Sequence, residues 1–354
     1  MRIDSNKAVL IRVDASPQIG AGHLIRMLAL GQLLAEAGHE VHFATIPYNI
    51  SAIDFFLKDS KFKLHYMNKE TSWNSVTDAD GLLEIALHVH PLWVVIDGYH
   101  FGADYESKIK MSGYRLLRID DIPEGRKYFV DAILNQNFGA DSSAYSVGPG
   151  TRILAGLQYV LLRREFREMH SQRKISKGVE PYHILVSLGG GTEIADTLIA
   201  RIAEGLSTLS DRQSIETTLL VGKMSKNIRN LEEEVKVRRW PVLLKEHSSN
   251  MAAEMLKADL AIVSGGSTMW ELIYMNVPFL AVALTEPQRE YLRMLSQNNL
   301  CVDLGWHENL TADLIGRMTQ DLIQDQKRRE QLLDTYECTM DRGNIGKELL
   351  EIFR

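Results

Sequence analysis

A histidine follows two closely spaced glycines near the start of the chain, in the segment Gly20-Ala21-Gly22-His23, which we call the histidine loop. Glycines after a strand let a ligand approach the backbone, and a helix that begins there directs free N–H groups and its positive dipole end toward that ligand. We place His23 in the first helical turn, where the positive end favours the neutral imidazole, the form that acts as a base. The alternative is a tight turn with an incidental histidine. Ile25 stands where a dinucleotide fingerprint has its third glycine, and no P-loop lysine follows.

Two further glycine-rich segments occur late in the chain, each between an apolar run and a helical pattern. Residues 187–192 read SLGGGT, and a flexible turn is the alternative to a ligand loop there. Residues 265–268 read GGST after a buried run, and we interpret them as a phosphate loop. Glu271 falls one turn into the next helix, where its carboxylate can accept hydrogen bonds from a ribose diol. Ser267 or Thr268 with Glu271 also fits a capping box, the alternative without a ligand.

Polar residues also end two apolar runs of the first half. Asp97-Gly98-Tyr99-His100 lies at the carboxyl end of one predicted parallel strand, where ligands bind in open α/β sheets. Tyr99 can donate a hydrogen bond there to a sugar or a water, or it is a buried tyrosine at a domain edge. Asp120-Asp121 ends the other run. We interpret this pair as structural, or at most as part of a cleft wall, because nothing completes a metal site.

Short apolar runs alternate with helical patterns in both halves of the chain, and this alternation predicts open, mostly parallel sheets. The turn-rich and basic stretch 140–180 predicts the crossing between two domains, residues 1–165 with the histidine loop and residues 166–354. In the first domain we expect strands at 8–14, 41–45, 92–97, 115–120 and 132–134, and a helix at about 21–37 ended by Gly38. In the second we expect strands at 183–188, 217–221, 242–245, 259–263 and 278–284, and helices at 269–275 and 320–336.

Composition narrows the class of protein and its surroundings. The length of 354 residues suits two domains, and the net charge of -6 argues against nucleic acid or an anionic membrane as the main partner. No run approaches the roughly 18–20 apolar residues of a membrane span, and the N-terminus lacks a signal-peptide pattern. Cys301 and Cys338 lie too far apart for a disulfide framework or a metal knuckle. We expect a cytoplasmic protein without metal, cofactor or stable membrane insertion.

Several unusual motifs occur in a fixed order between about residue 8 and residue 300. They are Asp14-Ala15-Ser16, Gly20-x-Gly22-His23-x-x-Arg26, Asp97-x-Tyr99, Ile119-Asp120-Asp121, Asn135-Gln136-Asn137, Leu161-Leu162-Arg163-x-Glu165-Phe166, Ser187-x-Gly189-Gly190 and the run from Ala258 through Gly265-Gly266-Ser267-Thr268 to Trp270-Glu271. This order resembles the PseG family, the UDP-sugar hydrolases of pseudaminic acid biosynthesis.

The resemblance implies a fold and a reaction. The fold is of the GT-B type, two Rossmann-like α/β domains that face each other across a cleft, similar to the transferase MurG. The reaction is the inverting, metal-independent hydrolysis of UDP-2,4-diacetamido-2,4,6-trideoxy-β-L-altropyranose at its anomeric carbon. His23 matches the family's catalytic histidine, which would activate the water, and Tyr99 matches the tyrosine near that water. The C-terminal domain would bind UDP, with the diphosphate at Ser267 and its glycines and the ribose at Glu271. The full set of expected substrate contacts is Asp14, Gly20, Gly22, Arg26, Ser187, Gly189, Gly190, Gly265, Gly266, Ser267, Thr268, Glu271 and Gln288.

One departure from the family keeps other functions open. The family usually shows Glu-Asn-Gln where this chain has Glu286-Pro287-Gln288, and proline cannot donate a hydrogen bond. Gln288 can keep part of the role. The alternatives are a GT-B glycosyltransferase that moves the sugar of a UDP-sugar onto an acceptor, and a nucleotide-sugar binding protein without catalysis.

Overall fold

The chain folds into two compact units. The computed structural model describes residues 7–16, 19–48, 50–57, 61–68, 76–172, 182–189, 193–209, 215–222, 225, 228–238, 242–246, 248 and 250–354. The first unit contains the described residues of Met1–Ser16, with His23–Arg164 and Asp341–Arg354; the second contains those of Pro17–Gly22 and Glu165–Met340. The chain leaves the first unit at Arg164, next to the predicted boundary, but its last residues return to the first unit instead of staying in the second.

The first unit is built on a parallel sheet of seven strands in the order β3-β2-β1-β4-β5-β7-β9. Short apolar runs at its centre are buried on both faces, as parallel strands between helices require. The strands are β1 (Ala8–Val13), β2 (Glu40–Thr45), β3 (Lys63–Tyr66), β4 (Trp93–Asp97), β5 (Arg115–Ile119), β7 (Ala132–Asn135) and β9 (Arg152–Ala155), and β6 (Lys127–Tyr128) pairs separately with β8 (Ser146–Val147). The helices are α1 (Gly22–Glu36), α2 (Ile50–Leu57), α3 (Val76–Val89) and α4 (Ala103–Met111).

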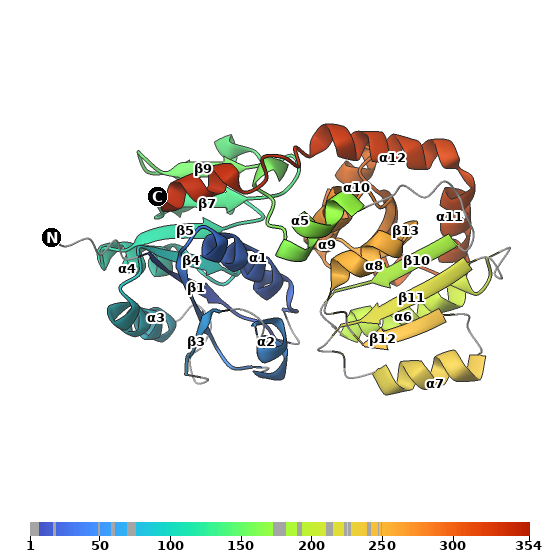
Figure 1. Cartoon of the computed structure of the whole chain (residues 1–354), viewed down its shortest axis with the longest axis horizontal. Coiled ribbons are helices and arrows are strands. Elements are labelled where there is room, and N and C mark those ends of the chain that lie inside the picture. Colours follow the sequence, from blue (N-terminus) through green and yellow to red (C-terminus); the bar gives the residue numbers. More distant parts are fainter. Residues whose placement is uncertain are drawn as a thin grey trace. The chain divides into compact units, whose positions relative to one another are not determined.

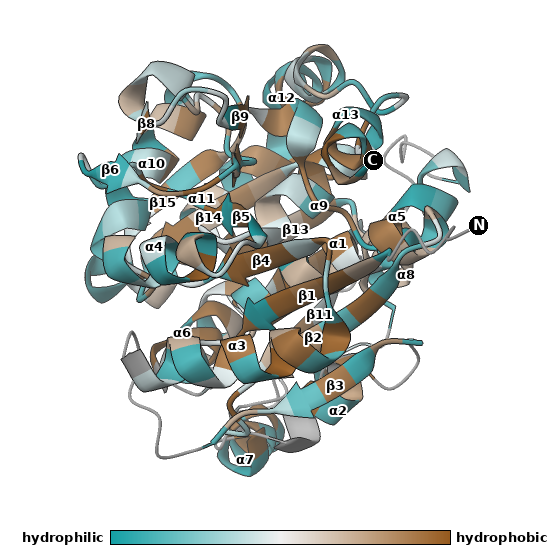
Figure 2. Ribbon diagram, turned by 90° about the vertical axis from the view of Figure 1, so that its left-hand side faces the viewer, coloured by the Kyte–Doolittle hydropathy of each residue, from teal (hydrophilic) through white to brown (hydrophobic). Residues whose placement is uncertain are grey.

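Two apolar cores lie in the first unit. One joins buried side chains of α1, such as Leu24 and Met27, to residues of β1 and β4; the other joins the sheet to α3 and α4 through Leu82 and Ile109. Figure 2 shows the result as brown central strands β1, β2 and β4 beside a mostly teal α4. Helices therefore cover both faces of the sheet, and the ends of the strands are the places where functional side chains can reach a ligand.

The second unit has a parallel sheet of six strands in the order β12-β11-β10-β13-β14-β15, the arrangement of a dinucleotide-type Rossmann sheet. Figure 1 shows the strands and helices of both units. The strands are β10 (Tyr182–Ser187), β11 (Ile215–Val221), β12 (Val242–Glu246), β13 (Leu260–Ser264), β14 (Phe279–Ala283) and β15 (Val302–Trp306). The helices are α5 (Arg164–Met169), α6 (Glu193–Leu206), α7 (Ile228–Arg238), α8 (Met251–Lys257), α9 (Thr268–Tyr274), α10 (Glu286–Gln297), α11 (Ala312–Gln324) and α12 (Gln326–Thr339).

The predicted class of two Rossmann-like α/β domains is confirmed, with two local corrections. The single helix predicted over 320–336 is wrong, because α11 ends at Gln324 and α12 begins at Gln326. Asp325 separates them and accepts a hydrogen bond from the Arg328 amide as the N-cap of α12. The stretch 140–180 is not wholly a crossing either, since Arg152–Ala155 forms the edge strand β9 beside β7.

The C-terminal residues complete the core of the first unit. Leu349 of α13 (Lys347–Leu350), Ile352 and Phe353 belong to the same buried cluster as residues of α1 and β4. The ring of Phe353 lies 5.5 Å from that of Trp93. The tail therefore supports the helix that begins with the histidine loop.

Candidate functional site

Polar side chains from α1, β4 and the segment after β5 converge at the carboxyl edge of the first sheet. Because β4 lies between β1 and β5 in parallel register, the ends of these strands meet at one edge. His23 and Arg26 come from the first turns of α1, Asp97 ends β4, and Asp121 follows β5. Tyr99, two residues past β4, completes the group.

His23 is paired with a buried carboxylate. Its Nδ1 lies 2.7 Å from Oδ1 of Asp97, whose side chain is fully buried. A carboxylate oxygen accepts, so the contact requires that Nδ1 carry the proton and donate it. In the neutral ring Nε2 then carries no proton, and this nitrogen can accept one. His23 thus has the arrangement of an oriented general base.

Arg26 is held between two carboxylates. Its Nε and Nη2 donate to Asp97 at 2.6 and 2.7 Å, and its Nη1 donates to both oxygens of Asp121 at 2.7 and 2.9 Å. Burial works against charge here, but Arg26, aided by His23, holds the pKa of Asp97 well below its usual range, and Arg26 lowers that of Asp121. Arg26 thus donates to two carboxylates of the protein, and its contact with a substrate stays a prediction.

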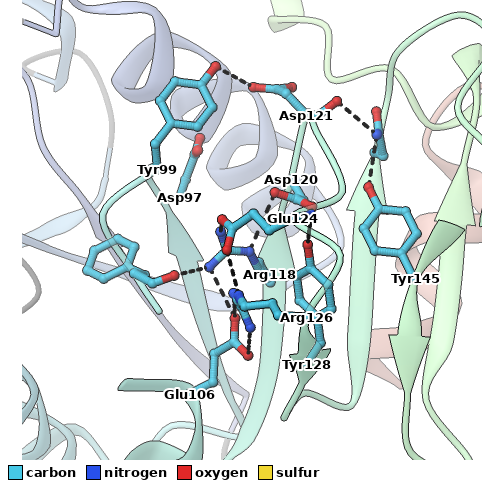
Figure 3. Close-up of polar contacts among 12 residues, drawn as sticks. Asp97, Tyr99, Glu106, Arg118, Asp120, Asp121, Glu124, Arg126, Tyr128 and Tyr145 are labelled. Carbon is cyan, nitrogen blue, oxygen red and sulfur yellow. Dashed lines mark hydrogen bonds and ion pairs between the residues drawn. The ribbon is translucent and has the colours of Figure 1, made fainter. Parts of the chain in front are cut away.

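Tyr99 faces the same cluster through its hydroxyl. The residue is 64% exposed, yet its hydroxyl donates to Oδ2 of Asp121 at 2.9 Å, as Figure 3 shows. Its ring stands edge-on to that of His23 with 4.9 Å between centroids. Desolvation of the hydroxyl and the charge of Asp121 raise the pKa of Tyr99. Tyr99 is therefore not the buried tyrosine of the alternative interpretation, and its proton is already donated within the protein.

Asp14, the first of the expected substrate contacts, lies beneath this surface. The residue is 1% exposed, and its Oδ1 accepts from Arg12 Nη1 at 2.5 Å and from the Ile46 amide at 2.8 Å. Arg12 in turn pairs with the buried Asp78. These contacts fix the end of β1 to the segment after β2, so the structure gives Asp14 a role in holding the sheet edge.

The two glycines of the histidine loop differ in backbone conformation. Gly20 has φ +75°, a conformation that favours glycine. Gly22 is exposed and has no positive φ, and a Cβ built on it would meet no described atom within 4 Å. Among the described residues nothing explains the absence of a side chain at Gly22, and this leaves the backbone beside His23 open to a ligand.

In the second unit, two glycine loops meet at one serine. Ser264 ends β13, and its hydroxyl donates to the Leu188 carbonyl at 3.3 Å. Cβ atoms built on Gly189, at φ +95°, and on Gly266 would each lie 3.9 Å from that hydroxyl. The ends of β10 and β13 therefore place bare backbone side by side. Ser187 is the last residue of β10, whereas Gly190 lies outside the described residues.

The loop before α9 is partly open and is supported by Gln288. Gly265, Gly266, Ser267 and Thr268 are half-buried, and Ser267 makes no side-chain cap hydrogen bond, so the capping box is not formed by it. Glu271 is buried in the first turn of α9. Oε1 of Gln288 accepts from the Leu284 amide at 2.8 Å, and a Cβ on Gly265 would meet the Gln288 side chain at 3.1 Å. Pro287 occupies the first turn of α10, where a missing N–H is tolerated.

Two residues of the cluster, Asp97 and Asp121, are not among the site residues predicted from the sequence. From sequence, Asp97 is only the start of a motif, although it orients His23. Asp121 is interpreted there as structural, or at most as part of a cleft wall, although it contacts Tyr99 and Arg26. Their position after neighbouring parallel strands was the available signal. No group of three or more His, Cys, Asp or Glu in the described part of the chain is arranged to hold a metal ion. Within the same residues, no helix has both the length and the apolar character needed to cross a bilayer.

Comparison with known proteins finds relatives in sequence and in fold. Residues 185–334 match the Glycosyltransferase family 28 C-terminal domain. The UDP-2,4-diacetamido-2,4,6-trideoxy-beta-L-altropyranose hydrolase of Campylobacter jejuni is 27% identical over 298 residues, 83% of this chain and 98% of that protein. The resemblance to the PseG hydrolases is confirmed. The spore coat polysaccharide biosynthesis protein SpsG of Bacillus subtilis is 26% identical, with 84% of each chain covered.

An uncharacterized protein of Methanocaldococcus jannaschii is 24% identical over 308 residues, which are 82% of this chain but only 60% of that protein. Among solved structures, Acinetobacter baumannii MurG superposes with a TM-score of 0.63 at 13% identity over 98% of this chain and 99% of MurG. S. aureus MnaA, solved with UDP, superposes with a TM-score of 0.64 at 12% identity over 98% of this chain and 96% of MnaA. The predicted GT-B fold is thereby confirmed.

Proposed function

We propose that the chain is a hydrolase that releases UDP from a UDP-linked 2,4-diacetamido-2,4,6-trideoxy sugar. The observation that carries the proposal is the 2.7 Å contact between Nδ1 of His23 and Asp97, which leaves Nε2 as the basic nitrogen. The full-length relative from Campylobacter jejuni, a hydrolase of such a UDP-sugar, supports the substrate class. Formation of this sugar for pseudaminic acid-type nonulosonate biosynthesis is part of the proposal, as is action in the cytoplasm.

The proposed step is a displacement at the anomeric carbon. The oxygen of water bonds to that carbon from the face opposite UDP, one water proton passes to Nε2 of His23, and the bond to the diphosphate oxygen breaks. UDP leaves with the bonding electron pair, and the configuration inverts. Asp97 keeps Nδ1 protonated and stabilises the imidazolium that forms, as the buried carboxylate of a catalytic triad does. The diphosphate is itself a good leaving group, so we assign no metal to the step.

We assign UDP to the second unit. Bare backbone at Gly189, Gly265 and Gly266 allows a diphosphate to approach closely, and Ser267 and Thr268 lie half-buried in the same loop. We retain Glu271 as the ribose contact from the family resemblance. Gln288 acts mainly by supporting the Gly265 turn, which explains how the site keeps its shape with Pro287 in place of asparagine.

UDP release from the UDP-linked diacetamido altropyranose tests the proposal. We expect His23→Ala to lower kcat roughly 10²–10⁴-fold, the usual contribution of a general base. His88→Ala is the matched control, since His88 is an exposed histidine of α3 in the same unit. The assignment fails if wild type releases no UDP, or if His23→Ala and His88→Ala release it at the same rate.

A glycosyltransferase is the second candidate. The match to a glycosyltransferase family 28 domain and the likeness to MurG favour it. In that case a hydroxyl of an acceptor takes the place of water beside His23, and the sugar appears on the acceptor. NMR analysis of the products, with and without added acceptors, separates the two reactions, because only hydrolysis yields the free sugar with UDP when no acceptor is present.

A further inference from the structure

Asp121 accepts hydrogen bonds from two members of the first-unit cluster, Arg26 and Tyr99, and from Asn137. Its Oδ1 accepts from Arg26 and, at 3.1 Å, from the Asn137 amide; its Oδ2 accepts from Arg26 and from the Tyr99 hydroxyl. The side chain of Asp121 is 17% exposed, that of Arg26 7%, and that of Asp97 is fully buried. Little water therefore competes for the contacts that Arg26 makes with the two carboxylates.

The neighbouring Asp120 faces a different network. Its Oδ2 accepts from Tyr128 at 3.2 Å, and Arg118 lies 3.6 Å from its Oδ1. Figure 3 shows Asp120 turned to Tyr128 and Arg118, and Asp121 turned to Tyr99. Burial raises the pKa of Asp120, whereas Arg26 lowers that of Asp121 against the effect of burial. The two adjacent carboxyl groups thus have separate environments, and only one of them reaches the cluster.

The contact from Tyr99 to Asp121 has a defined direction. An ionised carboxylate only accepts, so the phenol must donate its single proton to Asp121. The Tyr99 oxygen then offers only lone pairs to a ligand. In the neutral ring, Nε2 of His23 also offers a lone pair, because Nδ1–H donates to Asp97. The two rings stand edge-on with 4.9 Å between their centroids, and each ring carries one of these acceptors.

We propose that Asp121 is a positioning residue that fixes Tyr99 as an acceptor beside His23 and thereby selects water as the nucleophile. Water has two O–H bonds, one for each acceptor, whereas an alcohol has one and leaves an acceptor unmatched. This inference rests on the proposed function and deepens it, because it gives a reason for hydrolysis over transfer. Tyr99 was expected to donate to a sugar or a water; the direction of its bond to Asp121 makes it accept instead.

The ratio of products in buffer containing methanol tests the selection. Methanol attack at the same carbon forms a methyl glycoside, with its proton passing to His23, and water attack forms the free sugar. We expect Tyr99→Phe to raise the ratio of methyl glycoside to free sugar roughly tenfold, the effect of one lost hydrogen bond. Asp121→Asn should raise it as well, because the amide lacks the charge that orients Tyr99 and Arg26. The double variant should not exceed Tyr99→Phe.

Asp120→Asn is the matched control, and we expect it to keep the wild-type ratio. The proposal is overturned if Tyr99→Phe leaves the ratio unchanged, or if Asp121→Asn behaves like Asp120→Asn. A change in folding alone would lower the rate without altering how each turnover divides between water and methanol.

Ultraviolet titration tests the Tyr99–Asp121 contact without any Asp121 variant or any turnover. In the difference spectrum between wild type and Tyr99→Phe, we expect Tyr99 to ionise only above the ordinary tyrosine pKa of about 10, because desolvation and the charge of Asp121 both favour the protonated hydroxyl. Ionisation of Tyr99 near the ordinary value overturns the proposal. Failure of the wild type to release UDP would instead refute the proposed function, so the two failures are distinguishable.

Discussion

Arg26 determines the charge of the buried carboxylate that orients His23. Asp97 is fully buried, and burial alone would raise its pKa; the adjacent guanidinium reverses this shift. We expect Arg26→Gln to raise the pKa of Asp97 toward neutrality. Ionised Asp97 accepts from Nδ1 more strongly than the neutral acid does, and only the ionised form stabilises the imidazolium by its charge. The variant should therefore lose activity as the pH falls through this raised pKa. In wild type Asp97 stays ionised far below that range.

The pH dependence of kcat/KM for UDP release measures this effect between about pH 5 and 9, a window above the ordinary aspartate pKa of about 3.9. Arg164→Gln is the control, because Arg164 pairs with Glu36 on the surface of the same unit. An acid limb that lies at the same pH in wild type and Arg26→Gln would show that Arg26 does not govern Asp97. The pH affects folding stability in the same direction. The contribution of Asp97 to the free energy of unfolding is present above the pKa of Asp97 in the unfolded chain, and it is lost as the pH falls through its pKa in the folded protein.

Two glycines in helices show how packing between elements determines whether substitution by alanine raises or lowers stability. Gly316 of α11 lies against α6, and a Cβ on it would be 2.7 Å from the Gly205 carbonyl and 2.6 Å from Thr208 Oγ1. We expect Gly316→Ala to destabilise the second unit by about 1–3 kcal/mol, the usual effect of overpacking. In α3, a Cβ on Gly81 meets only the flexible end of Met67 at 3.4 Å. There Gly81→Ala should stabilise by about 0.5–1 kcal/mol, since alanine favours helix.

Urea denaturation of both variants, with hydrogen exchange to follow each unit, measures these opposite signs. If neither variant lost stability, the close contact of Gly316 with Gly205 would be contradicted; if both did, the free space at Gly81 would be contradicted. Gly81 serves as the control for Gly316, because both replace a helical glycine by alanine and differ only in the space around it.

The effects of these two glycine substitutions depend on contacts that the sequence alone does not predict. Local patterns were enough to predict the central strands and α1, because a buried parallel strand requires an apolar run and the positive φ of Gly38 suits a helix end. Contacts between distant segments were out of reach. The neighbours Asp120 and Asp121 look alike in sequence, and only the folded sheet edge shows which one meets Tyr99. In sequence Arg26 is only an expected substrate contact, whereas the folded chain places it between Asp97 at the end of β4 and Asp121 after β5.

At the scale of the whole molecule, the chain ends in the unit where it begins. Residues 341–354 follow the second unit in sequence but pack into the first, where Tyr159 donates to Glu348 at 2.8 Å and the tail joins the core of α1. The sequence carried no signal for this return, because a short apolar tail fits either unit. The stability of the histidine loop's helix therefore depends on residues more than 300 positions away along the chain.

Phe353→Ala tests that dependence. Phe353 is 1% exposed and packs against Trp93, so its loss should destabilise the first unit by about 3–5 kcal/mol, as for other buried aromatic truncations. We expect faster hydrogen exchange in α1 and β4, with α6 and α11 unchanged. Lys347→Ala, an exposed change in the same tail, should stay within about 0.5 kcal/mol of wild type. Equal exchange in α1 for Phe353→Ala and Lys347→Ala would mean that the helix carrying His23 is stable without the tail, and that the return of the chain does not support the site.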